Sequence, residues 1–140
     1  MAGVSLFRID KVVECVHYPE VRAVVSHWES LCNSECVAAI KRGSDECRRV
    51  GAKTWIVDLT QNPGVPSQAD LRWMESEGVE LGKRNGVTAV INVHGESALA
   101  AMGSKRWTRG ASRGGMVTWD CKSLADALEL AGKVAAGKAA

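Results

Sequence analysis

The chain has 140 residues, of which 46% are hydrophobic and 24% charged, and its formal net charge is +2 at pH 7. This length fits one domain, and the composition excludes disorder of the whole chain and gives no reason to expect a polyanionic partner. No stretch approaches the roughly 18 consecutive apolar residues of a membrane span, and the N-terminus lacks the pattern of a signal peptide. Five cysteines, an odd number with no Cys-x-x-Cys pair, predict free thiols in a reducing cytoplasm.

The first predicted element is a short strand at 12–16, where three valines give the β-branched content typical of strands. A turn with Pro19 at its second position follows. Residues 21–28 fit either a helical stripe or a strand. Three valines and a tryptophan directly after a turn favour the second strand of a hairpin. We therefore predict an antiparallel hairpin at the start of the fold.

A helix is predicted between Asn33 and Gly51. Asn33 and Ser34 can cap its start, and apolar residues recur through the segment at helical spacing. Gly51 is a favoured residue just past a helix C-terminus. Residues 54–59 form a short, mostly apolar run, which indicates a buried central strand.

A loop and a capped helix follow this central strand. Residues 61–66 contain two prolines and one glycine, which are typical of a loop. The stretch from Ser67 to Asp70 has the spacing of a capping box, with Asp in the place usually held by Glu. The helix that it opens is predicted to reach about Arg84, and a second buried strand is predicted at 87–93.

Two further helices and one strand complete the chain. Ser97 is predicted to open a helix, residues 110–115 to form a loop and residues 116–119 to form the last strand. Ser123 is predicted to open the final helix, and residues 133–140 are predicted to form a flexible tail of small residues.

The resulting order is β-β-α-β-α-β-α-β-α. Strands that alternate with helices predict a mainly parallel sheet, here with an antiparallel hairpin at its start. We expect a single α/β domain over residues 1–132, with a mixed sheet of four to five strands and about four helices.

Three segments in this order resemble the STAS domain, the fold of anti-sigma-factor antagonists and of the cytoplasmic tails of sulfate transporters. They are the strand Trp-Ile-Val-Asp-Leu at 55–59, the loop and helix start Val-Pro-Ser-Gln-Ala-Asp-Leu-Arg-Trp at 65–73, and the closing helix start Ser-Leu-Ala-Asp-Ala-Leu at 123–128. The resemblance spans residues 12 to 131 and is nearest to small stand-alone STAS-like proteins. It implies a STAS-like (SpoIIAA-like) fold and a non-enzymatic regulatory or protein-interaction function without a cofactor. The implied partner is a protein of the kinase or regulator class, or a second copy of the chain.

Ser67 has two interpretations. Anti-sigma-factor antagonists carry an Asp-Ser-Ser-Gly type segment at this helix start, and its Ser is phosphorylated by a partner kinase. Here the loop reads Asn-Pro-Gly-Val-Pro-Ser at 62–67, so Ser67 falls near that place but the surrounding motif is absent. A Ser at this position also caps the helix, which by itself stabilises a protein by about 1 kcal/mol. Ser67 is therefore either a cap alone or a phosphoacceptor as well.

Other chemical signatures in the chain are incomplete. The stretch 94–99 has only one of the two glycines of a Gly-x-Ser-x-Gly elbow, and Ser97 is again a natural helix cap. Cys32 and Cys36 have no further cysteine or histidine at zinc spacing, so we expect no metal site. Four basic residues surround Trp107, but with the near-neutral total charge they favour a solvated helix face, and neither nucleic acid nor membrane is an expected partner.

Five tryptophans lie in five different predicted elements, and most are expected in the core, with one or two lining a groove. This leaves an alternative function open, a carrier or sensor of a small apolar or anionic ligand held between the second and third helices. A third hypothesis is an enzyme that uses a thiol or Asp58.

The candidate site lies where the central strand ends. In an open α/β sheet, ligands and partners meet the carboxyl ends of the strands, and the STAS resemblance implies partner binding at the same loop. Pro63 and Pro66 should stiffen this loop. We predict no catalytic residue, and an interaction surface at residues 63–73. The binding or regulatory candidates are Asp58, Thr60, Ser67, Asp70 and Trp73.

Overall fold

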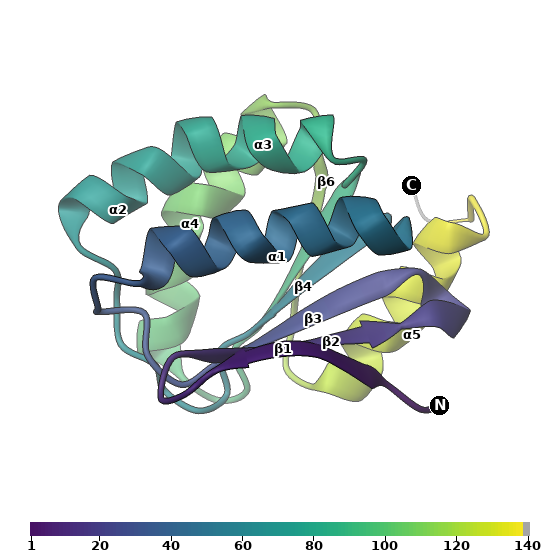
Figure 1. The fold of residues 1–140 in the computed structure, drawn as a ribbon, viewed down its shortest axis with the longest axis horizontal. Coiled ribbons are helices and arrows are strands. Elements are labelled where there is room, and N and C mark those ends of the chain that lie inside the picture. The colour runs from purple at the N-terminus through teal and green to yellow at the C-terminus, as the bar shows by residue number, and fades with distance from the viewer. Residues whose placement is uncertain (139–140) are drawn as a thin grey trace.

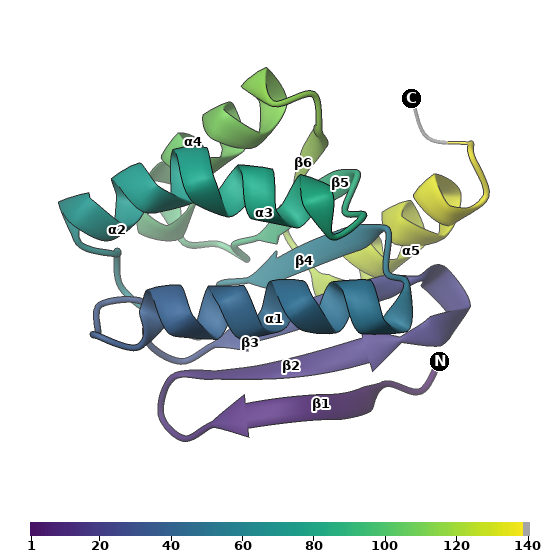
Figure 2. The same ribbon diagram turned by 45° about the horizontal axis from the view of Figure 1, so that its top comes forward.

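Six strands lie side by side in the computed structural model, which describes residues 1–138, in the same order as they occur in the sequence (Figures 1 and 2). The first three strands pair antiparallel, and the last three are parallel to β3 and to one another. Their bounds are β1 Val4–Ile9, β2 Val13–Tyr18, β3 Ala23–Trp28, β4 Thr54–Asp58, β5 Ala89–Val93 and β6 Val117–Cys121.

Helices cover both faces of this sheet. Three helical segments each connect two neighbouring parallel strands and lie together on one face, which we call the three-helix face (Figure 2). They are α1 (Cys36–Val50), a continuous run of α2 (Gln68–Trp73), the π segment η2 (Met74–Gly78) and α3 (Val79–Arg84), and α4 (Ala98–Arg113). The last helix, α5 (Leu124–Ala135), packs on the opposite face, beside the short 3₁₀ turn η1 (Pro19–Val21). None of the helices within residues 1–138 is both long and apolar enough to span a membrane.

The predicted hairpin is confirmed, because β2 and β3 pair antiparallel from Val13 opposite Trp28 to Tyr18 opposite Ala23. The predicted number of strands is wrong, since β1 adds a sixth strand at the edge of the sheet. Only Phe7 of this strand is buried, and the pairing with β2 shifts between Ser5 and Phe7. An edge strand with so little buried surface lacks the apolar run that identifies the central strands.

Side-chain caps set three of the predicted helix starts, and a glycine sets one predicted end. The hydroxyl oxygens of Ser67, Ser97 and Ser123 each accept a hydrogen bond from the backbone N–H three residues later. Gly51 ends α1 in the left-handed conformation with a φ of 70°.

The predicted cap of α1 by Asn33 or Ser34 is wrong, because α1 begins at Cys36 with Glu35 at the cap position and no side-chain cap. The predicted loop at 110–115 is wrong at 110–113, which form the last turn of α4. Residues 133–135 of the predicted tail form the end of α5, and residues 139–140 lie outside the described part of the chain.

Alternation along the strands divides the core into two layers. On the α5 face, small and β-branched side chains pack closely, including Ala23, Ile56 and Ile91 from the sheet and Ala127 from the helix. On the three-helix face the core is built from larger residues, with tryptophans from β3, β4 and α4 and methionines at 74 and 116. The two faces of the sheet therefore differ in the side chains that cover them.

Candidate functional site

Asp58 ends β4 and holds a small polar cluster at the carboxyl edge of the sheet. Its carboxylate lies 2.6 Å from Nδ1 of His27 and accepts hydrogen bonds from the backbone N–H of Thr60 at 3.0 Å and from the Thr60 hydroxyl at 2.7 Å. His27 lies directly opposite Asp58 in the parallel pairing of β3 with β4. The cluster thus joins two strands and the first residues of the loop that follows.

Burial alone would raise the pKa of the Asp58 carboxyl, but the hydrogen bonds from His27 and Thr60 outweigh it and lower the pKa below its ordinary value. Asp58 is therefore an ionised anchor at neutral pH. It orients the His27 ring and starts the 59–67 loop, and each of these roles uses one of its two carboxylate oxygens.

A second histidine–aspartate pair lies at the next strand ends. Nε2 of His94, just after β5, is 2.9 Å from the Asp120 carboxylate on β6, which also lies 3.4 Å from the amide nitrogen of Asn92. An open groove of about 370 Å³ passes between this pair and the start of α4. Ser97 lies in the groove, but its hydroxyl oxygen accepts from the Ala100 N–H at 3.1 Å and so serves as a helix cap.

Four of the five predicted site residues fall into two groups. Asp58 and Thr60 belong to the cluster with His27, and the Asp58 side chain shares the α5 face with Ile56 because residues two apart on a strand point the same way. Ser67 and Asp70 form the cap of α2 on the opposite face, with 3.1 Å between the Asp70 nitrogen and the Ser67 hydroxyl. Trp73 is half-buried, and the ammonium nitrogen of Lys41 lies 5.8 Å from its ring centre.

The start of α2 and the loop before it contact the middle of α4. Nη1 of Arg106 lies 2.7 Å from Oε1 of Gln68, and a Cβ placed on Gly103 would lie 3.5 Å from the Val65 side chain. Leu99 and Met102, one turn or less before Gly103, are 63% and 66% exposed. This places two large apolar side chains on the surface next to the predicted interaction segment.

Four of the five thiols are placed where they react poorly. Cys15, Cys36, Cys47 and Cys121 are buried and free, whereas Cys32 is exposed. Burial raises the pKa of Cys15 to about 12 and that of Cys36 to about 12, so both stay protonated at neutral pH. Among the described residues, no group of three or more His, Cys, Asp or Glu side chains is arranged to hold a metal ion.

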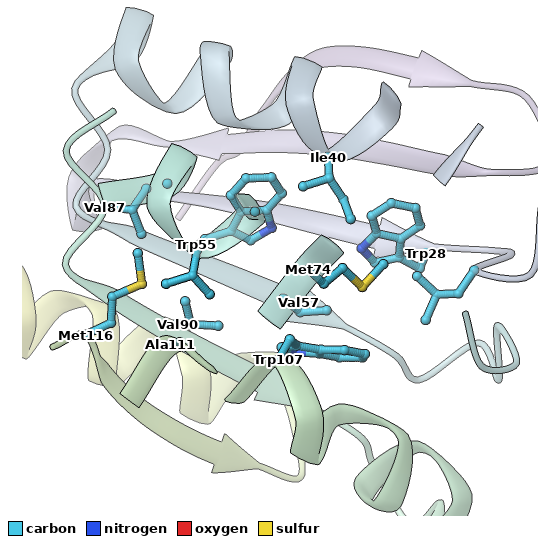
Figure 3. Close-up of a pocket in the computed structure, with 14 residues that line it drawn as sticks. Trp28, Ile40, Trp55, Val57, Met74, Val87, Val90, Trp107, Ala111 and Met116 are labelled. Carbon is cyan, nitrogen blue, oxygen red and sulfur yellow. The ribbon is translucent and has the colours of Figure 1, made fainter. Parts of the chain in front are cut away.

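A cavity of about 100 Å³ lies on the three-helix face, between the sheet and the helical segments that cover it. We call it the tryptophan cavity. Figure 3 shows the rings of Trp28, Trp55 and Trp107 around it, together with the side chains of Met74 and Met116. The rings come from β3, β4 and α4, and the two methionines from η2 and the residue before β6. Every residue that lines the cavity is apolar.

The indole N–H groups of these three rings are all hydrogen-bonded to side chains of the sheet. The Ser26 hydroxyl oxygen accepts from Nε1 of Trp28 at 3.0 Å and of Trp55 at 2.8 Å, and donates to the Ile56 carbonyl at 3.3 Å. Oδ1 of Asn92 accepts from Nε1 of Trp107 at 2.9 Å. The polar edge of each ring is thereby held by the sheet.

The sequence predicted one or two tryptophans at a groove, and the structure brings three together. The alternation of side chains along a strand was a usable signal for two of them. β3 and β4 are parallel, and Trp28 and Trp55 each stand at a position that points to the three-helix face. Trp107 had no comparable signal, since its place depends on how α4 packs. Trp107 is nevertheless buried, as expected for most of the tryptophans.

Comparisons with known proteins found no matching family model, no matching curated protein and no matching solved structure. The STAS resemblance therefore remains a prediction. Residues 1–138 show a general α/β fold with a six-stranded mixed sheet and four helices.

Proposed function

We propose that this chain is a non-enzymatic regulatory domain of the STAS type, which binds a protein partner through residues 63–73 and 97–103. We call these residues the α2–α4 surface. The observation that carries the proposal is the pair of exposed apolar side chains, Leu99 and Met102, beside the exposed start of α2.

The loop part of this surface is held in place before any partner arrives. Pro63 and Pro66 are buried, and the Leu31 N–H donates to the Pro63 carbonyl at 2.9 Å. Ser67 and Gln68, which follow directly, are exposed. A surface that is already ordered loses little conformational entropy on binding, which supports its use as an interface.

Leu99 and Met102 are three residues apart on α4 and so share one side of the helix. Single exposed apolar residues are ordinary, but adjacent ones with a polar rim are typical of protein interfaces. The rim here is provided by Ser67, Gln68 and Lys105. We therefore expect a partner with an apolar centre and a polar border on its contact surface.

Ser67 offers a means of regulating this contact. Its exposed hydroxyl caps α2, where a phosphate would add about two negative charges beside the positive end of the helix dipole. The modified residue would keep the cap favourable while changing the charge at the rim of the surface. A kinase would then belong to the same regulatory system as the partner.

The double variant Leu99→Asp, Met102→Asp tests the surface. Partners captured from the native host by the tagged chain are identified, and the dissociation constant of the purified partner is measured for parent and variant. We expect a loss of at least about tenfold in affinity, with stability changed by no more than about 0.5 kcal/mol. Val117→Asp, at an exposed apolar position on β6, is the matched control and should bind normally. Equal binding by the double variant and the parent would exclude this surface.

Ser67→Ala and Ser67→Asp separate capping from regulation. If Ser67 only caps α2, Ala should cost about 1 kcal/mol, Asp should stabilise as well as Ser, and neither should alter partner binding. A regulatory Ser67 predicts that Asp changes partner affinity while Ala mainly lowers stability. Sedimentation at several protein concentrations identifies the case in which the captured partner is a second copy of the chain.

A further inference from the structure

The tryptophan cavity lies within the three-helix face, and its walls exclude polar ligands. All residues around it are apolar, and the three indole N–H groups are already bonded to Ser26 and Asn92. A charged or strongly hydrogen-bonding molecule would lose its water there and gain no partner, which is unfavourable. An occupant must therefore be uncharged and largely apolar.

Two helix glycines let α1 and α3 approach side chains that line the cavity. A Cβ on Gly43 of α1 would lie 2.8 Å from the Trp55 ring, and a Cβ on Gly82 of α3 would lie 3.3 Å from the end of Met116. Glycine is unfavourable inside helices, and a void in a core loses the contacts that a filled one would make. Gly82 lines the cavity and Gly43 packs against the Trp55 ring that borders it, so part of this cost falls on the cavity wall.

The wall also contains the only π geometry among the described helices. Met74 and Gly78, the first and last residues of η2, both line the cavity, and Val79 follows directly. Single π turns within α-helices occur often at functional sites. Here the π segment contributes a long, flexible methionine and a residue without a side chain to the same cavity wall.

Ring shape follows from the wall chemistry and the volume. Aromatic molecules pack favourably against the faces and edges of tryptophan rings, and methionine sulfur makes favourable contacts with aromatic edges. A dry apolar cavity of about 150 Å³ is large enough to take up benzene. The tryptophan cavity is smaller, at about 100 Å³, so it admits one ring only when the flexible methionines on its wall shift. Bicyclic molecules would need a much larger movement of the wall.

We propose that the tryptophan cavity is a binding site for a small, uncharged, planar aromatic molecule of one ring. This site is separate from the α2–α4 surface in its residues and its chemistry. Its ligand would be held by ring packing alone.

Toluene, cyclohexane and benzoate are the probes, and binding is followed by tryptophan fluorescence and by protein NMR shifts. We expect saturable binding of one toluene per chain, with shifts centred on the indole N–H signals of the three cavity tryptophans. Cyclohexane should bind about tenfold more weakly, and benzoate about 100-fold more weakly or not at all. No saturable toluene binding, or benzoate binding as tight as toluene, would overturn the proposal.

Ala111→Leu places a larger side chain in the cavity, and Ala125→Leu makes the same change on the exposed side of α5 as a control. The first should reduce toluene affinity at least about tenfold, and the second should leave it unchanged. If Ala111→Leu does not fold, Gly82→Ala provides a smaller filling that pushes on Met116. A folded filling variant that binds toluene like the parent would place the toluene elsewhere and contradict the proposal.

Discussion

On the α5 face, alanines at 127 and 131 let the helix approach closely over Ile56 and Ile91, all with no measurable exposure. On the three-helix face, three tryptophans and two methionines surround an open volume. One sheet thus carries a closely packed layer of small side chains and a layer of large rings that leaves space. The difference indicates that stability is concentrated on the first face and adaptability on the second.

We expect the largest difference in stability when an isoleucine is replaced by alanine on each of the two faces. Ile56→Ala removes a fully buried side chain from the α5 face and should lower the free energy of unfolding by about 2–5 kcal/mol. Ile40→Ala, at the wall of the tryptophan cavity, should cost about half as much or less, because this side chain is partly exposed and already borders empty space. Urea unfolding of both variants measures the difference, and equal losses would contradict the comparison.

A smaller effect is expected at Ser26, where the three-helix face depends on one hydroxyl. Ser26→Ala leaves two buried indole N–H groups without an acceptor and should cost about 2–4 kcal/mol. Replacing Trp28 by Phe removes one of those donors, so Ser26→Ala should cost less in a Trp28→Phe background. A double-mutant cycle by urea unfolding checks this. A cost that is unchanged by Trp28→Phe would mean that the hydroxyl acts in another way.

The smallest effect concerns Asp58 at the carboxyl edge of the α5 face. Its pKa in the folded protein lies below the ordinary value of 3.8, so its stabilising contribution is complete above that value and is lost as the pH falls through the folded pKa. Asp58→Asn should therefore destabilise the protein at pH 7, and the difference from the parent should shrink at pH 3. Unfolding at both pH values is the measurement, with Asp126→Asn, an exposed residue of α5, as the control. A destabilisation that grows on acidification would contradict the lowered pKa of Asp58 in the folded protein.

Local signals in the sequence were sufficient for most of the fold. Ser67, Ser97 and Ser123 begin helices through bonds to residues three positions on, and Gly51 ends one by its own backbone conformation. Such signals are complete within a few residues, so the chain order of helices and central strands could be predicted. Strand β1 could not, because it is an edge strand with one buried side chain.

The site was less predictable because its contacts are long-range. His27 and Asp58 are 31 residues apart, and only the parallel register of β3 and β4 brings them together. Treating Asp58 and Ser67 as one site overlooked that their side chains lie on opposite faces of the sheet. The tryptophan cavity depends on the packing of three helical segments, which residue spacing along one segment cannot specify.

The π segment η2 bears on where homologues of this chain can differ in length. A π turn accommodates one more residue than the α-helical turn it replaces. The run from Gln68 to Arg84 therefore has the form of an α-helix with a one-residue insertion, absorbed between Met74 and Gly78. Removal of that residue would leave the capped start at Ser67 and the end at Asn85 in place. Single-residue length variation among homologues is thus expected at 74–78 rather than at either end of the helix.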